Sequence, residues 1–227
     1  MSLFERYKAG EHAAVYEELV AAPPGAEGGD AVAREMMKRV RANLETLVRR
    51  WRELGFTLYD PLGKPGESRA DVKRFEDAWG PLPVTLRALY HEVGHINLVE
   101  DPPEDRWPEP EHVDAIAIEG IDRAMELSEE DGELSENGRL VLFLDNLLKI
   151  GYGGIGAIYI ELGPAFDPLL CFEDGSLRDP ETEKPMRLVP YLRQTILQRG
   201  GMGIAGAPID ELDTSLLREL TTGLIAF

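Results

Sequence analysis

Hydrophobic residues recur at helical spacing near the start of the chain. Between residues 30 and 54 the apolar positions lie three or four residues apart, at Met36, Val40, Leu44, Leu47 and Trp51. This spacing places them on one face and predicts a long amphipathic helix. Asp30 is the predicted N-cap, and Gly55 is predicted to end the helix. A shorter helix is predicted within residues 1–20, so residues 1–54 form a predicted N-terminal helical arm.

The rest of the chain alternates short apolar runs with turn-forming residues. Helices are predicted over 70–79, 83–94, 121–127 and 186–198, and a last helix reaches Leu220; an acidic loop is predicted directly after residue 127. Short strands are predicted at 56–59, 96–99, 113–118, 139–144, 156–162 and 167–172, with a hairpin turn at Asp174-Gly175. We therefore predict an α+β fold, in which a mainly antiparallel sheet is flanked by helices. Its predicted parts are the arm, a domain at 55–206 and a C-terminal helix within 207–227 packed on that domain.

The composition is that of a folded, strongly acidic protein. Of the 227 residues, 43% are hydrophobic, and 42 acidic against 24 basic residues give a formal net charge of −18. Such a chain repels phosphate backbones and anionic lipid headgroups, so we expect neither nucleic acid nor a membrane as partner. It attracts basic proteins and accelerates their encounter. The charge therefore predicts a basic protein as the partner.

The negative charge is concentrated in one segment. Residues 1–80 contain 13 basic and 14 acidic residues, whereas Glu100–Glu136 contains 15 acidic residues and two arginines. Much of this segment reads as loops, and recognition residues often lie in loops on a rigid scaffold. Trp107 offers an apolar anchor among the charges. The predicted partner-binding residues are Glu100, Asp101, Glu104, Asp105, Trp107, Glu109 and Glu111. The alternative is a solvated acidic surface, with Trp107 in the core.

The most specific motif is His91-Glu92-Val93-Gly94-His95, which has the form H-E-x-x-H. On a helix, two histidines four residues apart can bind zinc, and the glutamate acts as general base. A zinc-dependent hydrolase that uses His91, Glu92 and His95 is therefore one hypothesis. However, Gly94 and the strand-like residues after it indicate that the helix ends near residue 94, which removes His95 from the helical register. Asp101 and His112 remain as third ligands, and neither completes a known signature.

Two further features have ordinary structural interpretations. Gly151-Tyr-Gly-Gly-Ile-Gly156 matches G-x-G-x-x-G, but a dinucleotide site needs a helix after the glycines, and a strand is predicted there. Cys171 is the only cysteine, so an intrachain disulfide is impossible, and a reducing, cytoplasmic location is expected. It lies in an apolar run and is predicted to be a buried, unreactive thiol. We predict no cofactor, no bound metal and no catalytic residue.

A longer pattern spans much of residues 30–205. The stretch Phe75-Glu-Asp-Ala-Trp79-Gly-Pro-Leu-Pro83 leads into a helix that ends in Tyr90, followed by Val93-Gly94 and a strand. Later come Asp145-Asn-Leu-Leu-Lys149, Gly153-Gly154, Val189-Pro-Tyr191 and Gly200-Gly201. Their order and spacing resemble the SUKH superfamily, which includes fungal regulators of cell-wall synthesis and bacterial immunity proteins. The helical arm is similar to the extension that such proteins often carry.

The resemblance implies a protein-binding module, often one that neutralises a toxin such as a nuclease, and it implies no catalytic residues. It also gives Glu92, Val93 and Gly94 the role of fold positions. The leading hypothesis is thus a non-enzymatic acidic module that binds a basic protein. A zinc hydrolase, and a regulatory or assembly protein unrelated to toxins, are the alternatives.

Overall fold

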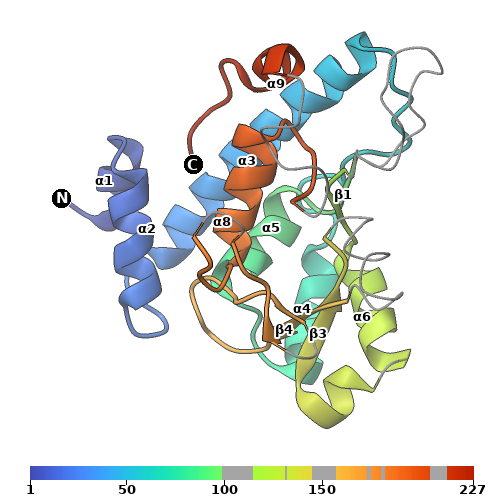
Figure 1. Cartoon of the computed structure of the whole chain (residues 1–227). Coiled ribbons are helices and arrows are strands. Elements are labelled where there is room, and N and C mark those ends of the chain that lie inside the picture. Colours follow the sequence, from blue (N-terminus) through green and yellow to red (C-terminus); the bar gives the residue numbers. More distant parts are fainter. Residues whose placement is uncertain (99–114, 131, 145–156, 173–174, 180–181, 205–213) are drawn as a thin grey trace.

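The computed structural model describes residues 1–98, 115–130, 132–144, 157–172, 175–179, 182–204 and 214–227. The architecture is α+β, as predicted, with helices and small antiparallel sheets. A long helix, α3 (Gly29–Glu53), crosses the molecule, with α1 (Leu3–Lys8) and α2 (His12–Ala21) to one side (Figure 1). Among the described helices, none combines the length and the apolar character that crossing a membrane requires.

The helical arm departs from its prediction at two points. The helix predicted within 1–20 is broken at Gly10, whose φ of 104° lies in the left-handed region. Asp30 is not the N-cap of α3: the cap is Gly28, and the Asp30 carboxylate in the first turn accepts a hydrogen bond from Arg87 at 2.6 Å. The apolar face of α3 was predicted correctly, since Met36, Val40 and Leu44 are fully buried.

The remaining helices lie close to their predicted positions. They are α4 (Arg69–Trp79), α5 (Val84–Glu92), α6 (Ile121–Glu130), α8 (Leu188–Leu192) and α9 (Thr214–Thr221). Helix α8 continues into the π-helical segment η3 (Arg193–Gln198). The prediction of a loop after residue 127 was wrong, because α6 extends to Glu130 and a π-helical turn, η2 (Glu133–Asn137), follows.

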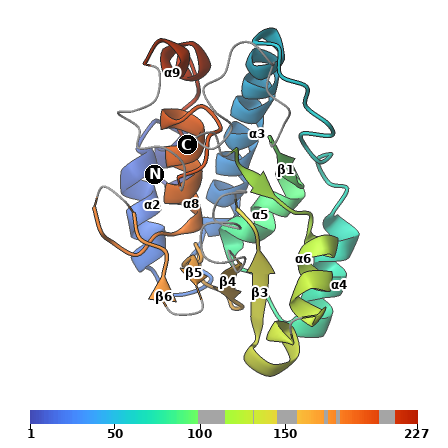
Figure 2. The same ribbon diagram turned by 45° about the vertical axis from the view of Figure 1, so that its right-hand side comes forward.

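The strands form two antiparallel sheets among the described residues, where one was predicted. In the smaller sheet, β1 (Ile96–Asn97) pairs with β2 (Ala117–Ile118). The larger has the order β3 (Arg139–Leu142), β4 (Ile158–Glu161), β5 (Cys171–Phe172) and β6 (Gly175–Ser176). The strand predicted at 56–59 is not formed. Helices α4 and α6 lie beside each other near β3 (Figure 2).

A large hydrophobic core joins most of these elements, and a second, smaller cluster contains Val141 and Tyr159. The buried residues of the large core run from Tyr7 in α1 to Phe227 at the C-terminus, and α3 packs against α5. The C-terminal segment is attached to α3 by polar contacts. Asn43, which is buried, donates to the Ile225 carbonyl at 2.8 Å and accepts from the Ile225 N–H at 2.7 Å. The arm therefore shares a core with the rest of the chain.

A buried carboxylate joins three of the packed elements. Asp167 is 1% exposed and accepts hydrogen bonds from Tyr16 of α2 and Thr85 of α5, each at 2.6 Å. It also accepts from the Val189 N–H of α8 at 3.2 Å. Burial raises the pKa of Asp167 to about 6, although these donors and Arg187 act in the opposite direction. The carboxyl therefore fixes the position of the arm, and its charged form is costly.

Candidate functional site

The two histidines of the H-E-x-x-H motif do not share a helical face. Helix α5 ends at Glu92, and Val93 is its C-cap. His95 lies beyond the helix, where its Nε2 is 2.9 Å from the Asp60 carbonyl oxygen and 3.5 Å from an Asp60 carboxylate oxygen. The predicted loss of helical register before His95 is confirmed. The i, i+4 geometry on which the zinc hypothesis depends is therefore absent.

The glycine of the motif has a packing role. Gly94 has a φ of 82°, and a Cβ at this position would lie 3.0 Å from the Cα of Gly63. The Gly63 N–H donates to the His95 carbonyl at 3.0 Å. Arg41 donates to the Val93 carbonyl at 3.1 Å and also to the Gly63 carbonyl. The turn after α5 is thus fixed by contacts between two backbone segments, which accounts for the Val-Gly pair.

Zinc analysis tests the hydrolase hypothesis directly. We expect less than one tightly bound zinc per chain in protein purified without a histidine tag, because His95 is directed toward Asp60 and away from the helix. Within the described residues, no three His, Cys, Asp or Glu side chains are placed to hold a metal ion. Asp101 and His112 lie outside those residues. Stoichiometric zinc that is lost on His91→Ala substitution would establish a metal site and support the hydrolase hypothesis.

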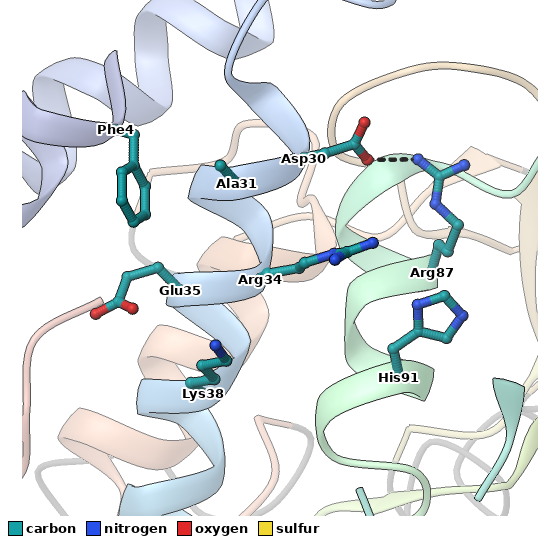
Figure 3. Close-up of a pocket in the computed structure, with 8 residues that line it drawn as sticks. All are labelled: Phe4, Asp30, Ala31, Arg34, Glu35, Lys38, Arg87 and His91. Atoms are coloured by element: carbon teal, nitrogen blue, oxygen red, sulfur yellow. Dashed lines mark hydrogen bonds and ion pairs between the residues drawn. The ribbon is translucent and has the colours of Figure 1, made fainter. Parts of the chain in front are cut away.

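A solvent-open groove lies between α3 and α5. Its volume is about 670 Å³, and its lining comes from α1, α3 and α5 (Figure 3). The lining residues are Phe4, Asp30, Ala31, Arg34, Glu35, Lys38, Arg87 and His91. Arg34 extends from α3 toward the side of α5 that carries Arg87 and His91, and Asp30 pairs with Arg87 at 2.6 Å. Basic side chains from two helices therefore meet in one groove.

His91 is in a positively charged environment. Burial lowers its pKa most, and Arg34, Arg69 and Arg87 lower it further, whereas Glu76 acts in the opposite direction. Arg69 begins α4, and its side chain lies against Gly66, whose N–H donates to the His91 carbonyl at 2.8 Å. The side of α5 on which the alternative zinc hypothesis places the metal is therefore lined by cations, which repel a metal ion.

The described part of the predicted acidic segment presents an acidic helix. Exposed carboxylates on α6 and η2 are Asp122, Glu126, Glu129, Glu130 and Glu136. Arg123 pairs with Glu126 at 3.0 Å, but Glu129 and Glu130 make no ion pair with any described residue. In η2, Glu133 pairs with Arg139 at 2.7 Å. The exposed face of α6 thus carries uncompensated negative charge.

The structure describes none of the predicted partner-binding residues. Glu100, Asp101, Glu104, Asp105, Trp107, Glu109 and Glu111 all lie outside the described residues. The glycine run at 151–156 lies outside them as well. Cys171 is half-buried, less buried than predicted, with its Sγ 4.0 Å from the Ser176 hydroxyl. Among the described residues of this group, Cys171 does not line the groove.

The groove between α3 and α5 was not predicted from the sequence. A signal was present in α3, where Arg34 and Lys38 are one turn apart, on the polar face. Arg87 and His91 are likewise one turn apart in α5. Nothing in the sequence indicated that these two faces would meet, because their pairing depends on how α3 packs against α5.

Comparisons with family models, with curated proteins and with solved structures found no match for this chain. The resemblance to the SUKH superfamily therefore stays a prediction.

Proposed function

We propose that the protein is a non-enzymatic binding module whose partner is a basic protein. A toxin domain of the nuclease class is the favoured partner, since such domains are basic and the SUKH resemblance implies toxin neutralisation. A regulatory or assembly partner of the same charge would use the same surface. A cytoplasmic location belongs to this proposal. The observation that carries it is the uncompensated acidic face of α6.

The acidic face is arranged at the expense of helix stability. Glu126 and Glu130 are four residues apart, so their like charges repel across one turn. Glu129 and Glu130 lie in the last turn of α6, where the helix dipole disfavours negative charge. A surface made only for solubility intermixes charges of both signs. Charges that oppose the stability of their own helix are better explained by recognition of a cationic surface.

Helix α6, which carries the acidic face, is also held firmly by the residues beneath it. Ile121 and Ala124, on the opposite side of α6, are buried in the core. The Ser128 hydroxyl donates to the Ala124 carbonyl at 2.6 Å and accepts from the Val141 N–H of β3 at 2.7 Å. Helix α6 is therefore held rigidly against β3. A rigid, charged helix face steers an oppositely charged partner without an ordering cost.

The cost of this arrangement can be measured. Replacing Glu130→Lys removes the repulsion with Glu126 and places a cation at the end of α6. We expect the free energy of unfolding to rise by about 0.5 kcal/mol at low ionic strength. Urea unfolding at two salt concentrations measures the gain, which should shrink at high salt. A loss of stability would show that Glu130 makes a favourable contact in the folded state.

Capture from the native cells tests the proposal itself. The bait is the whole chain at low ionic strength, in three forms: unchanged, with Glu129→Lys and Glu130→Lys together, and with Glu17→Lys and Glu27→Lys together. Glu17 and Glu27 are exposed positions on the arm and the loop before α3, so the third form makes the same change in net charge away from α6. We expect a basic protein on the first and third baits, and little of it on the second.

An equal loss on the second and third baits would mean that general charge attraction accounts for binding, and equal retention on all three would mean that the charges of α6 do not contribute; either result would refute the role of α6. Retention of an acidic or neutral protein that is unaffected by both pairs of substitutions would refute the proposed class of partner.

A further inference from the structure

Two exposed cations in the groove between α3 and α5 have no acidic partner among the described residues. Arg34 and Lys38 occupy successive turns of α3, are exposed, and make no ion pair or hydrogen bond with any described residue. Two cations one turn apart repel each other on a helix. In a chain with a net charge of −18, carboxylates are abundant, yet no described carboxylate pairs with either of these two residues.

The two carboxylates in the lining are already engaged. Glu35 accepts from Arg39, which is not part of the lining, at 3.0 Å. Asp30 pairs with Arg87 at 2.6 Å, and Glu76 of α4 is 3.4 Å from the same guanidinium. Neither lining carboxylate is paired with Arg34 or Lys38. The groove therefore keeps positive charge available to a ligand.

The shape of the groove suits a small anion with an organic part. Figure 3 shows Arg34, Arg87 and His91 on facing sides of the gap, with Phe4 of α1 across α3 from them. Arginine forks bind phosphate oxygens in pairs, and lysine adds a point charge. A single carboxylate would be neutralised by one of these residues, whereas a dianion uses several. The volume of about 670 Å³ is within the range of small-ligand sites.

We propose that this groove binds a phosphate-type dianion, held by Arg34, Lys38 and Arg87, with His91 at its edge. In the unliganded protein Asp30 pairs with Arg87, so it competes with the ligand and lowers the affinity. The site is separate from the acidic face of α6, so this proposal does not depend on the proposed basic partner. Its ligand is a phosphate monoester, either a free metabolite or a phosphorylated side chain, since both present the same group.

Isothermal titration with pyrophosphate, O-phosphoserine and sulfate tests the site, with chloride added to keep ionic strength constant. We expect one site per chain for each of the three anions. Arg34→Gln and Lys38→Gln should each weaken binding about tenfold, as for the loss of a charge-assisted hydrogen bond. Asp30→Asn should strengthen it. The control is Arg49→Gln, which removes an exposed charge from the same helix outside the groove and should leave affinity unchanged.

A second readout follows from His91. Protonation adds a cation to the groove, so sulfate, which stays dianionic, should bind more tightly as the pH falls from about 8 to about 5. The charged groups that face His91 are Arg34 and Lys38 of α3, Arg87 of its own helix, and Arg69 and Glu76 of α4. His91→Gln should flatten the profile. Stronger binding of a phosphoserine peptide than of free O-phosphoserine would identify a phosphorylated side chain as the source, and the reverse order a free metabolite.

The proposal would be overturned if none of the three anions showed saturable binding at millimolar concentration. It would also be overturned if Arg49→Gln weakened binding as much as Arg34→Gln, or if titration with chloride alone gave the same binding signal. Circular dichroism and thermal melting of each variant exclude unfolding as the cause. The exposed positions of Arg34, Lys38 and Arg49 make such unfolding unexpected.

Discussion

Asp167→Ala should lower the free energy of unfolding at pH 5 by about 3 kcal/mol. The substitution leaves the hydroxyls of Tyr16 and Thr85 and the N–H of Val189 without their acceptor in a buried site. These donors belong to α2, α5 and α8, so one side chain holds three elements together. Urea unfolding measures the loss.

Tyr16→Phe is the matched comparison, because it removes one donor of the same network and leaves the carboxyl in place. We expect it to cost about 1 kcal/mol. The double variant should lose less than the sum of the two single losses, since both changes act on one hydrogen bond. Additive losses would show that the Tyr16–Asp167 contact contributes little, and that Asp167 acts through Thr85 and Val189.

The same carboxyl makes stability depend on pH. The pKa of Asp167 is about 6 in the folded state, against an ordinary value of 3.8. Between these values the folded state binds more protons than the unfolded state, so the contribution of Asp167 is greatest below pH 4 and falls as the pH rises through 6. The loss between pH 4 and pH 7 is about 2 kcal/mol.

Asp167→Asn isolates this contribution from the other carboxylates, because asparagine keeps the shape and cannot ionise. The stability of the variant minus that of the unchanged protein should increase by about 2 kcal/mol from pH 4 to pH 7. A constant difference over this range would mean that the folded-state pKa of Asp167 is ordinary. A falling difference would mean that the hydrogen bonds outweigh burial.

The sequence predicted the features that depend on local pattern. The apolar face of α3 follows from the spacing of Met36, Val40 and Leu44, and the early end of α5 follows from Gly94. The α+β class follows from the same kind of evidence. These predictions succeed because they need only neighbours in the chain.

Features that depend on tertiary contacts were not predictable in the same way. Asp30 looked like an N-cap, but its carboxylate pairs with Arg87, which is far away in the sequence. The strand predicted at 56–59 is reduced to an isolated bridge at Thr57, and the neighbouring Leu62 bridges to Ile96. The groove was missed because Arg34 and Arg87 look like ordinary surface residues until α3 and α5 pack together. The predicted contact residues around Trp107 remain a prediction.

The central claim, recognition of a basic protein through an acidic surface, is tested most directly by the salt dependence of binding to the captured partner. Association rate and affinity are measured at about 50 mM and about 300 mM salt, for the unchanged chain and for the Glu129→Lys, Glu130→Lys variant. We predict an affinity loss of about tenfold or more for the unchanged chain, mostly in the association rate, and a smaller salt effect for the variant. An affinity that is insensitive both to salt and to the two substitutions would contradict the claim.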